Sequence, residues 1–356
     1  MKFCIMGGGV SGALLNRTLT ELGHDLTVFD KSSFQMRSGF GFLLLPNGIA
    51  GLKELGVWKD VEPYCLRIRK VNYINTSGDL TNQLDFEEVY SISRFKFLEA
   101  LASKGTSLIE DLVKLSENGD FIVGDHTNLS ANAFDGILGS DGVHSYTRTY
   151  LNPQAENQDT ATYEVMGVVK SDFLYNMLGN ELHKYAIAEN GLSLGILPLK
   201  DGEIIWFLQV NSIDHGVPNR DRASLLSFLK EKIGDCESPM IQALLNSNIE
   251  TSYVWQGRIL KNVTNIAKGN VFLFGDAAHL FLPFTSQGTN SAIVDVALFV
   301  QHLKSGKSLP EFAHQYSVER LAETNELVQS GVNMMHDFCF TDFDEVALKM
   351  PITILK

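Results

Sequence analysis

The sequence predicts an α/β fold: a domain built on a parallel sheet, interrupted by an antiparallel β-sheet domain and followed by a helical C-terminus. Three observations support this prediction. The first thirty residues show a strand, a glycine-rich turn, a helix and a second strand in succession. Short apolar segments separated by turn residues fill the middle of the chain. A long pattern with helical spacing follows Pro310.

The N-terminal segment has every part of a βαβ unit. KFCIM is a short apolar strand, and the leucines of the next segment recur at helical spacing as far as Gly23, which suits a helix C-cap. The second strand, DLTVFD, ends on Asp30. Between the first strand and the helix stands GGGVSG, with Gly7, Gly9 and Gly12 at the spacing of a dinucleotide-binding turn.

Each part of this turn has a physical role. Gly7 permits the tight turn, Gly9 lets the backbone approach a pyrophosphate, and Gly12 lets helix and strand pack closely. The helix N-terminus offers N–H groups to the phosphates, and Asp30 can accept hydrogen bonds from a ribose. Such a turn can also join a strand to a helix without binding anything. Because the whole βαβ context is present, we predict a Rossmann-like dinucleotide-binding domain, with NAD and FAD both open.

Composition and charge exclude several other classes of protein. The 356 residues carry a net charge of −13, which disfavours nucleic acid and anionic membranes as partners, since these bind through Lys and Arg. No apolar run reaches about 18 residues, so no membrane span is expected, and the N-terminal run is too short for a signal peptide. The four cysteines are scattered and the histidines lack ligand spacing, so we expect no metal site, no disulfide framework and a cytoplasmic location.

The middle of the chain predicts an antiparallel sheet. Its apolar segments are separated by turns such as Glu189-Asn190-Gly191 and Lys200-Asp201-Gly202. One helix is expected over ASLLSFLKEKIG, and a long C-terminal helix over EFAHQYSVERLAETNELVQSGVNMMHDF, where Met334, Met335 and Phe338 are interpreted as core. The predicted strands are EVMGVVKSDF, HKYAIAE, LSLGILPL and EIIWFLQV.

Three further segments narrow the choice of dinucleotide. FQMRSGFGFLLLPNGIAGLKELGVWKDV follows the βαβ unit, FDGILGSDGVHSYTR occupies 134–148, and NVFLFGDAAHLFLPFTSQGTN occupies 270–290. Together with GGGVSG, in this order over residues 1–330, they resemble the flavoprotein monooxygenases of the para-hydroxybenzoate hydroxylase type. That family pairs the N-terminal glycine turn with a central Asp-Gly motif and a late Gly-Asp motif.

The resemblance implies a role in FAD binding for particular residues. Asp276 in FGDAAH would hydrogen-bond the ribityl chain, beside small residues that leave room for the cofactor. Arg94 would open a helix near the phosphates, and Arg37 would lie in a flexible loop beside the flavin. Asp141 matches the Asp-Gly motif, which is linked to FAD and nicotinamide nucleotide binding. Pro283 would lie beside the isoalloxazine ring on the substrate side, and a helix near that ring would open with Gln287, Gly288, Thr289 and Asn290.

Several residues of these motifs have simpler interpretations. Asp276 could cap a following helix, Arg94 could be a solvated helix-start residue, and Arg37 could be an unattached loop residue. His279 is interpreted as a packing and hydrogen-bonding residue rather than a catalytic one.

The chain also departs from the family pattern at two places. Ser286 stands where a glycine usually precedes Gln-Gly, and its hydroxyl would adjust the contacts with the flavin. Asp30-Lys31 stands where Glu-Arg is usual. Because aspartate serves the ribose as well as glutamate does, Asp30 and Lys31 are still expected to contact the cofactor.

The resemblance implies an FAD-containing single-component monooxygenase with NADPH or NADH as reductant. Reduced flavin would trap O₂ as a C4a-hydroperoxide and pass one oxygen to a small-molecule substrate, so no side chain is expected to be catalytic. Because no flavin-attachment motif is found, FAD is expected to be non-covalent. The implied domains are an FAD-binding domain over 1–66, 93–156 and 259–309, a substrate domain over 67–92 and 157–258, and a C-terminal helical segment over 310–356.

Three other functions stay open at this point. A flavin-dependent halogenase shares much of this fold, but its Trp-x-Trp-x-Ile-Pro string is absent. A flavin oxidoreductase of the same fold could act without inserting oxygen. A protein could also bind FAD without turnover, because the binding motifs would look the same.

Two predicted strands bear on the substrate. GLSLGILPL and EIIWFLQV contain no Arg, Lys or His, whereas hydroxylases of small aromatic acids commonly hold the substrate carboxylate with a cation from this sheet. Burying a carboxylate there without a cation would be costly. We therefore predict a neutral, bulky aromatic or polyketide-like substrate, with Leu197 and Phe207 lining its pocket and Trp206 in pocket or core. If these strands face the core instead, loops set the polarity of the pocket.

Overall fold

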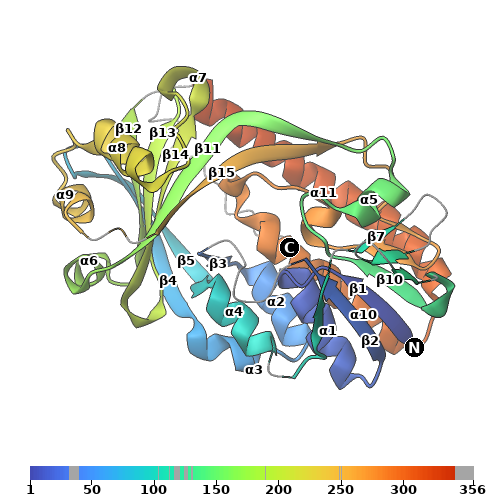
Figure 1. Ribbon diagram of the computed structural model, residues 1–356. Coiled ribbons are helices and arrows are strands. Elements are labelled where there is room, and N and C mark those ends of the chain that lie inside the picture. Colours follow the sequence, from blue (N-terminus) through green and yellow to red (C-terminus); the bar gives the residue numbers. More distant parts are fainter. Residues whose placement is uncertain are drawn as a thin grey trace.

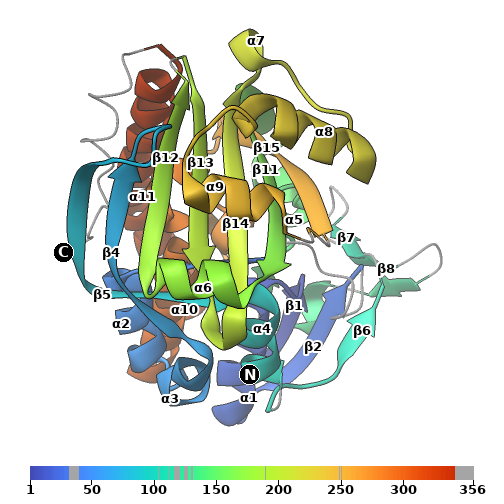
Figure 2. The ribbon, with the colours of Figure 1, turned by 90° about the vertical axis from the view of Figure 1, so that its left-hand side faces the viewer.

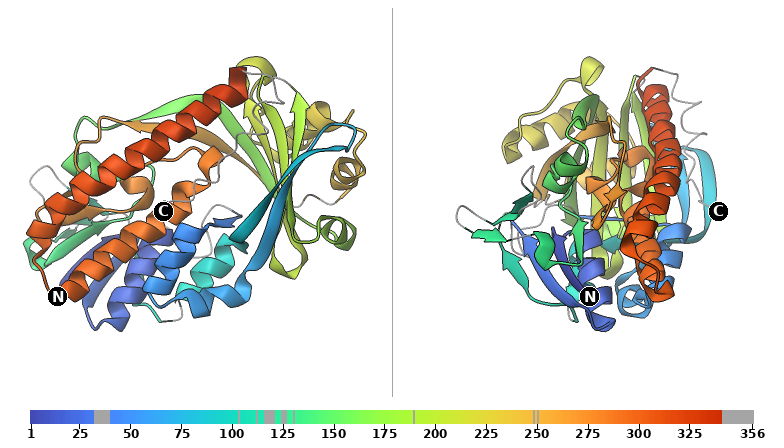
Figure 3. Two further views of the ribbon diagram at one scale, coloured as in Figure 1. Left: turned by 180° about the vertical axis from the view of Figure 1, so that it is seen from behind. Right: turned by 90° about the vertical axis from the view of Figure 1, so that its right-hand side faces the viewer.

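The computed structural model describes residues 1–31, 40–102, 104–111, 113–115, 121–123, 127–129, 131–188, 190–247, 249 and 251–340. Figure 1 shows two bodies, a layered α/β part and a large twisted sheet, with the long strands β11 (Glu156–Lys170) and β15 (Thr251–Lys261) reaching from one to the other. The helix α11, Leu309–Phe340, runs along the back of the molecule (Figure 3).

The parallel sheet contains the predicted βαβ unit. Its strands lie in the order β16-β17-β10-β1-β2-β6, and only the β16–β17 pair is antiparallel. Helix α1 joins β1 to β2 and ends just before Gly23, which has φ +78° and so occupies the left-handed region that suits a C-terminal glycine. The bounds are β1 Lys2–Met6, α1 Val10–Glu21, β2 Asp25–Asp30, β6 Leu108–Glu110, β10 Gly136–Gly139, β16 Ala267–Lys268 and β17 Val271–Leu273.

Side chains of β1 alternate between the two faces of this sheet. Phe3 and Ile5 pack in the main core beneath α1 and α10 (Gln287–Ser305). Cys4 and Met6 pack on the other face with Val113, which belongs to a small sheet of β7 (Val113–Leu115), β8 (Phe121–Val123) and β9 (Thr127–Leu129). With both faces covered, a ligand can approach only at the ends of the strands.

The large sheet has the order β15-β11-β14-β13-β12-β4-β5-β3. Its outer face is covered by α6, α8 and α9, as Figure 2 shows from that side. The bounds are β3 Gly41–Leu44, β4 Leu66–Ile74, β5 Leu80–Ser93, β12 Glu181–Ala188, β13 Leu192–Pro198, β14 Glu203–Asn211, α6 Asp172–Leu178, α8 Arg222–Ile233 and α9 Pro239–Leu245.

The sheet differs from the antiparallel sheet that the sequence predicts in one pairing. β12 and β4 are parallel, with Lys184 opposite Tyr73. Parallel neighbours need a long crossover, and here the chain leaves β4 through β5 and returns to β12 more than a hundred residues later. The domain ranges expected from the sequence stay a prediction. In the structure, β3 and the last residues of β15 belong to the large sheet, although the range predicted for the substrate domain does not include them.

Two predicted elements have different ends in the structure. The strand predicted over EVMGVVKSDF stops at Lys170, because Ser171 accepts a hydrogen bond from the Leu174 N–H and begins α6. Helix α11 begins at Leu309, so Pro310 lies in its first turn, where a missing N–H costs nothing. The last sixteen residues, 341–356, lie outside the described part of the chain.

Short helices complete the connections between these elements. None of the helices in the described ranges combines the length and apolar character needed to cross a bilayer. All four cysteines are buried and free. The remaining bounds are α2 Pro46–Glu54, α3 Trp58–Val61, α4 Arg94–Ala102, α5 Tyr146–Leu151, α7 Ser212–His215, and the 3₁₀ turns Glu62–Tyr64, Ala131–Ala133, Lys200–Gly202, Gly275–Ala277 and Pro283–Thr285.

Candidate cofactor and substrate site

Of the three motif glycines in the turn between β1 and α1, Gly9 is the one with space for a side-chain carbon. Gly7 has φ +98°, and a Cβ there would lie 2.3 Å from the Ser140 carbonyl oxygen. A Cβ on Gly12 would lie 1.8 Å from the Gly7 carbonyl oxygen, so both glycines are required by packing within the protein. The nearest atom to a Cβ on Gly9 is Arg94 Nη2, at 3.8 Å. The fold therefore tolerates a Cβ on Gly9 and leaves the backbone there open to approach.

Arg94 brings a positive charge to this turn as the first residue of α4. Burial lowers the pKa of Arg94, while the negative charges of Asp276 and Asp30 raise it, which places the guanidinium near both acids. Asp30 ends β2 and accepts a hydrogen bond from the Gly8 N–H at 2.6 Å. The structure therefore brings the predicted residues of three separate segments together beside Gly9.

Asp276 lies in the turn that follows β17, and its side chain is exposed. The N-cap positions of this turn and of α10 are Phe274 and Ser286, so the structure does not support the helix-cap interpretation of Asp276. The protein groups around the carboxylate raise the pKa of Asp276 by desolvation, while the charges of His279 and Arg94 oppose that rise. The side chain is positioned to meet a ligand at the carboxyl end of the sheet.

A buried arginine that was not anticipated from the sequence connects two of the motifs. Arg148, in α5, donates from Nη1 to the carbonyl oxygens of Asp276 and Ala277, at 3.0 and 3.1 Å. Its Nη2 donates to the carbonyl oxygen of Val143, in the Asp-Gly segment. Its position at the end of FDGILGSDGVHSYTR was the only sequence signal. Arg148 therefore fixes the loop of Asp276 against the Asp-Gly segment.

The carboxylate of Asp141 is used within the protein. It accepts hydrogen bonds from the N–H groups of Tyr146, at 2.7 Å, and Thr147, at 3.1 Å, and from the hydroxyl of Ser145. Burial raises the pKa of Asp141, and these hydrogen bonds oppose the rise. The predicted contact of Asp141 with the cofactor stays a prediction. In the structure, the Asp141 carboxylate binds the first N–H groups of α5.

Two predicted residues at the start of α10 bind neighbouring backbone and side chains. Asn290 accepts from the Leu45 N–H at 2.9 Å and donates to the Leu43 carbonyl oxygen at 2.9 Å. Gln287 accepts from Asn47 Nδ2 at 3.0 Å. Both side chains are fully buried, so they hold the junction of β3 and α2 against α10. Gly288, between them, borders open space, because a Cβ there would meet nothing within 4 Å.

The turn before α10 contains the residue that departs from the family pattern. Ser286 has φ 52° and ψ 22°, the left-handed region, which explains in physical terms why glycine suits this position. Its side chain makes no cap hydrogen bond to α10. Pro283 begins the preceding 3₁₀ turn and is half-buried, next to Leu282 and Phe284 in a cluster with the end of α11. Met334 and Met335 pack on that same cluster, which agrees with their interpretation as core.

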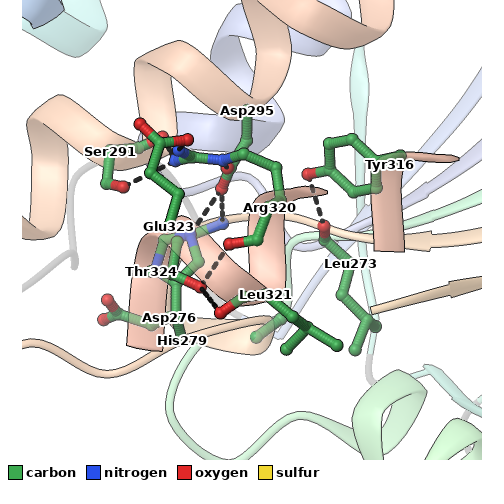
Figure 4. A network of polar contacts seen from close by, with 12 residues as sticks. Leu273, Asp276, His279, Ser291, Asp295, Tyr316, Arg320, Leu321, Glu323 and Thr324 are labelled. Carbon is green, nitrogen blue, oxygen red and sulfur yellow. Dashed lines mark hydrogen bonds and ion pairs between the residues drawn. The ribbon is translucent and has the colours of Figure 1, made fainter. Parts of the chain in front are cut away.

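A buried charged network lies behind the loop of Asp276 (Figure 4). Asp295, in α10, accepts from the Gly275 N–H at 2.8 Å and lies 2.7 Å from His279 Nε2. Arg320, in α11, donates from Nε to Asp295 Oδ1 at 2.8 Å and from Nη2 to Ser291 Oγ at 2.7 Å. These bonds agree with the interpretation of His279 as a packing and hydrogen-bonding residue. The sequence offered no signal for Asp295 or Arg320, since neither belongs to a motif.

The inner face of the large sheet carries both predicted pocket residues. Leu197 and Phe207 belong to one cluster, whereas Trp206 is fully buried in the opposite cluster beneath α8 and α9. Trp206 is therefore core. The same inner face carries Lys184 of β12 and Glu164 of β11, each 8% exposed. β13 and β14 contain no Arg, Lys or His, but the neighbouring strand β12 supplies Lys184 to the same face, so the expectation of a face without a cation is wrong.

Of the two remaining predicted residues, the structure describes one. Lys31 is exposed, immediately after Asp30. Arg37 lies outside the described residues, so its predicted contact stays a prediction.

A family model described as "FAD binding domain" matches residues 1–330. The chain belongs to the FAD-binding-domain family. The match spans both bodies of the structure and ends within α11, so it covers all of the motifs discussed above.

Relatives in this family are named as monooxygenases. The 3-amino-4-hydroxybenzoate 2-monooxygenase of Streptomyces cremeus is 25% identical, over 97% of this chain and 89% of its own length. The aurachin C monooxygenase/isomerase of Stigmatella aurantiaca is 22% identical, over 91% and 86%. The crystal structure of Klebsiella pneumoniae HpxO, complexed with FAD and uric acid, has a TM-score of 0.85 at 19% identity and covers 98% of this chain and 93% of HpxO.

These findings place the chain among the FAD-dependent oxidoreductases. FAD is its cofactor, and its fold is that of the para-hydroxybenzoate hydroxylase type. More narrowly, this member of the FAD-binding-domain family is an FAD-dependent monooxygenase of the aromatic hydroxylase type.

Proposed function

We propose that the protein is an NAD(P)H-dependent FAD monooxygenase that uses O₂ to hydroxylate a neutral, bulky aromatic or polyketide-like small molecule. The observation that carries this proposal is the convergence of Gly9, Arg94 and Asp276, from three distant segments, at the carboxyl end of the parallel sheet. That is where nucleotides bind in folds of this kind.

The residues present fit the parts of FAD. The open backbone at Gly9, the N-terminus of α1 and the charge of Arg94 would hold the pyrophosphate. Asp30 would accept from the adenosine ribose, and the exposed carboxylate of Asp276 would accept from the ribityl hydroxyls. Gly7 and Gly12 would act indirectly, because their lack of side chains closes the turn.

Other predicted residues would support the same site from further away. Asp141, Gln287 and Asn290 use their side chains within the protein, so they would position loops and leave cofactor contacts to their backbone groups. Gly288 would offer its backbone at the α10 N-terminus, next to open space. Lys31 and Arg37 would add positive charge near the nucleotide.

The chain itself would bind, orient and shield the substrate. When bound, FAD would supply the redox chemistry, which begins with reduction by NADPH or NADH and ends with transfer of one oxygen atom from O₂. Pro283, Leu197 and Phe207 would form an apolar wall that excludes water from the reacting groups. The opposite charges of Lys184 and Glu164 leave this wall without net charge, which suits a neutral substrate.

Purified protein tests the proposal directly. Its absorption spectrum reports bound flavin, and denaturation should release that flavin into solution if the attachment is non-covalent. NADPH and NADH oxidation is then followed with and without a panel of neutral polycyclic phenols and simple hydroxybenzoates. The masses of the products are determined by mass spectrometry.

Each outcome points to one function. A product heavier by one oxygen supports the proposal. Addition of a halogen would indicate a halogenase, addition of two hydrogens a flavin oxidoreductase that inserts no oxygen, and no turnover a protein that only binds FAD. Turnover of hydroxybenzoates with none of the neutral polycyclic phenols would contradict the proposed substrate class.

A further inference from the structure

The inner face of the large sheet is organised in rows of side chains that lie directly opposite one another. One row is apolar, with Val168 of β11, Ile205 of β14 and Leu197 of β13, and Leu182 of β12 packs in the same cluster. Two neighbouring rows carry the polar groups. Because the registers of the four strands agree, a single contiguous face changes from apolar to polar along the strand direction.

In the middle row, the ammonium group of Lys184 lies near the aromatic ring of Phe207. Phe207 lies opposite Gly195, and a Cβ on Gly195 would lie 2.0 Å from Phe207 Cζ, so the ring covers the glycine. Lys184 lies opposite Gly195 on the other side, and its Nζ is 5.8 Å from the centre of the Phe207 ring. The missing side chain of Gly195 therefore lets the ammonium group of Lys184 reach across one strand to the ring.

The third row holds an anion in a chain of hydrogen bonds. Glu164 accepts from Gln209 Nε2 at 2.9 Å, and Gln209 Oε1 lies 3.2 Å from the hydroxyl of Ser193. All three side chains are buried, at 8, 4 and 8% exposure. Such a chain orients the carboxylate and restricts its movement.

The two charges lie on one face of the sheet, on β12 and β11, which are separated by β13 and β14, and their burial is a cost to the folded state. Burial lowers the pKa of Lys184 to about 8 and raises that of Glu164, and each charge partly offsets the shift of the other. A buried pair of this kind is often no more stable than apolar residues of the same size. Its presence on a face that also bears the predicted pocket residues therefore indicates recognition of a ligand.

We propose that Lys184 and Glu164 form a donor–acceptor clamp that selects a neutral substrate with a hydrogen-bond acceptor and an adjacent donor on one edge. This inference rests on the proposed function and names the chemistry of its substrate subsite. The ammonium group of Lys184 donates to a carbonyl oxygen, and the carboxylate of Glu164 accepts from a neighbouring N–H or O–H. A substrate carboxylate is rejected, because it would face Glu164 without water to screen the repulsion.

Three bicyclic probes of similar size separate these chemistries. Isoquinolin-1(2H)-one carries a carbonyl oxygen next to an N–H, 2-naphthol carries a single hydroxyl, and 2-naphthoate carries a negative charge. Dissociation constants are measured with the FAD-loaded protein from changes in the flavin absorption spectrum. This binding measurement does not depend on turnover, so it stays informative if the proposed hydroxylation fails.

The clamp predicts opposite effects for its two halves. Wild-type protein should bind the lactam at least about tenfold more tightly than 2-naphthoate, the effect expected for one charge-assisted hydrogen bond. Lys184→Met should weaken lactam binding by a similar factor and should not improve 2-naphthoate binding. Glu164→Gln keeps the shape and the bond to Gln209 but removes the negative charge, so it should strengthen 2-naphthoate binding at least about tenfold.

A second charged pair in the same sheet provides the control. Lys170 and Glu203 lie opposite each other on β11 and β14, at 3.2 Å, and Lys170 is exposed at the end of its strand. Lys170→Met and Glu203→Gln should leave all three dissociation constants unchanged. The proposal is overturned if wild-type protein binds 2-naphthoate as tightly as the lactam or binds none of the probes. It is also overturned if Glu164→Gln folds and retains the wild-type order of affinities.

Discussion

Asp295 Oδ2 lies 2.7 Å from His279 Nε2, and both side chains are almost completely buried behind the loop that carries Asp276. The same oxygen accepts from the Gly275 N–H, one residue before Asp276. Arg320 binds the other oxygen from α11. One carboxylate therefore connects α10, α11 and the Gly-Asp loop, which explains how a loop that ends a strand can hold an exposed aspartate in a fixed position.

Replacement of Asp295 should destabilise the protein. Burial alone would raise its pKa, but His279, Arg320 and the hydrogen bonds outweigh burial and lower it. Asp295→Asn removes the buried carboxylate that neutralises Arg320 and leaves only the half-exposed Glu323 as its acidic partner among the described residues, so the free energy of unfolding at pH 7 should fall by roughly 3 kcal/mol. Because the folded-state pKa is lowered, this contribution is present above the unfolded-state pKa and is lost as the pH falls through the folded-state pKa.

Urea unfolding at several pH values checks this expectation. The difference between wild-type and Asp295→Asn protein should narrow below about pH 4, near the ordinary pKa of aspartate. Asp159→Asn is the control, because Asp159 pairs with Arg258 at 2.7 Å on the surface and should cost less than about 1 kcal/mol. Equal costs for the two variants would argue against the buried network.

Asp276→Ala should weaken FAD binding without unfolding the protein. In the proposed site the exposed carboxylate accepts hydrogen bonds from the ribityl hydroxyls, and each charge-assisted bond would contribute roughly 1.5–3 kcal/mol, so the FAD dissociation constant should rise at least about tenfold. Fluorescence titration of flavin-free protein measures this. Asp25→Ala, at the exposed opposite end of β2, should leave the constant unchanged. Unchanged affinity in Asp276→Ala would remove Asp276 from the site.

Gly9 and Gly12 should respond differently to the same substitution. Gly12→Ala places a methyl group 1.8 Å from the Gly7 carbonyl oxygen and should destabilise the fold by about 3 kcal/mol. Gly9→Ala meets no protein atom closer than 3.8 Å, so stability should change by less than about 0.5 kcal/mol. Its methyl group enters the space proposed for the pyrophosphate, and FAD affinity should fall at least about tenfold.

Thermal unfolding and flavin titration separate these two effects. The expected pattern is a lower melting temperature for Gly12→Ala and a normal melting temperature with weak FAD binding for Gly9→Ala. If Gly9→Ala binds FAD as wild type does, the phosphates do not approach the turn at this residue.

Lys184 should make stability depend on pH in alkaline solution. Its pKa of about 8 in the folded protein lies below the ordinary value of 10.5, so the unfolded chain binds more protons between these values. The contribution of Lys184 to the free energy of unfolding therefore increases as the pH rises from about 8 to about 10.5. Lys184→Met lacks this dependence and should be more stable than wild type at pH 7, by about 3 kcal/mol at most.

Chemical unfolding of wild type, Lys184→Met and the exposed control Lys170→Met between pH 7 and 10.5 tests this. The advantage of Lys184→Met should shrink as the pH rises, whereas Lys170→Met should follow wild type. A constant difference across the range would show that Lys184 does not titrate in this window.

Ser286→Gly should stabilise the turn before α10. Ser286 has φ 52°, and its side chain makes no cap hydrogen bond, so glycine relieves strain without the loss of a helix cap. The left-handed conformation costs serine about 1 kcal/mol, part of which is offset by the greater entropy of glycine in the unfolded chain. We expect a small rise in melting temperature for Ser286→Gly and none for Ser286→Ala, which keeps the strain.

The local sequence pattern alone predicts those helices and strands that depend on residues close together in the chain. The βαβ unit ending at Asp30, the strand before Asp276 and the helix α8 were all predicted, because side-chain periodicity and glycine placement act within a few residues. The boundary of α6 was missed, because one serine cap ended the strand earlier than its apolar pattern suggested.

Tertiary structure decided which side chains meet. Periodicity assigns Leu197 and Phe207 to one face of their strands, but it does not say that β12 and β11 place Lys184 and Glu164 on that same face. Likewise, the motif around Asn290 predicted its position near the cofactor, while the approach of β3 decided that its side chain binds Leu43 and Leu45. The physical reason is that strand order and register depend on packing between distant segments, whereas a motif records only the spacing within one segment.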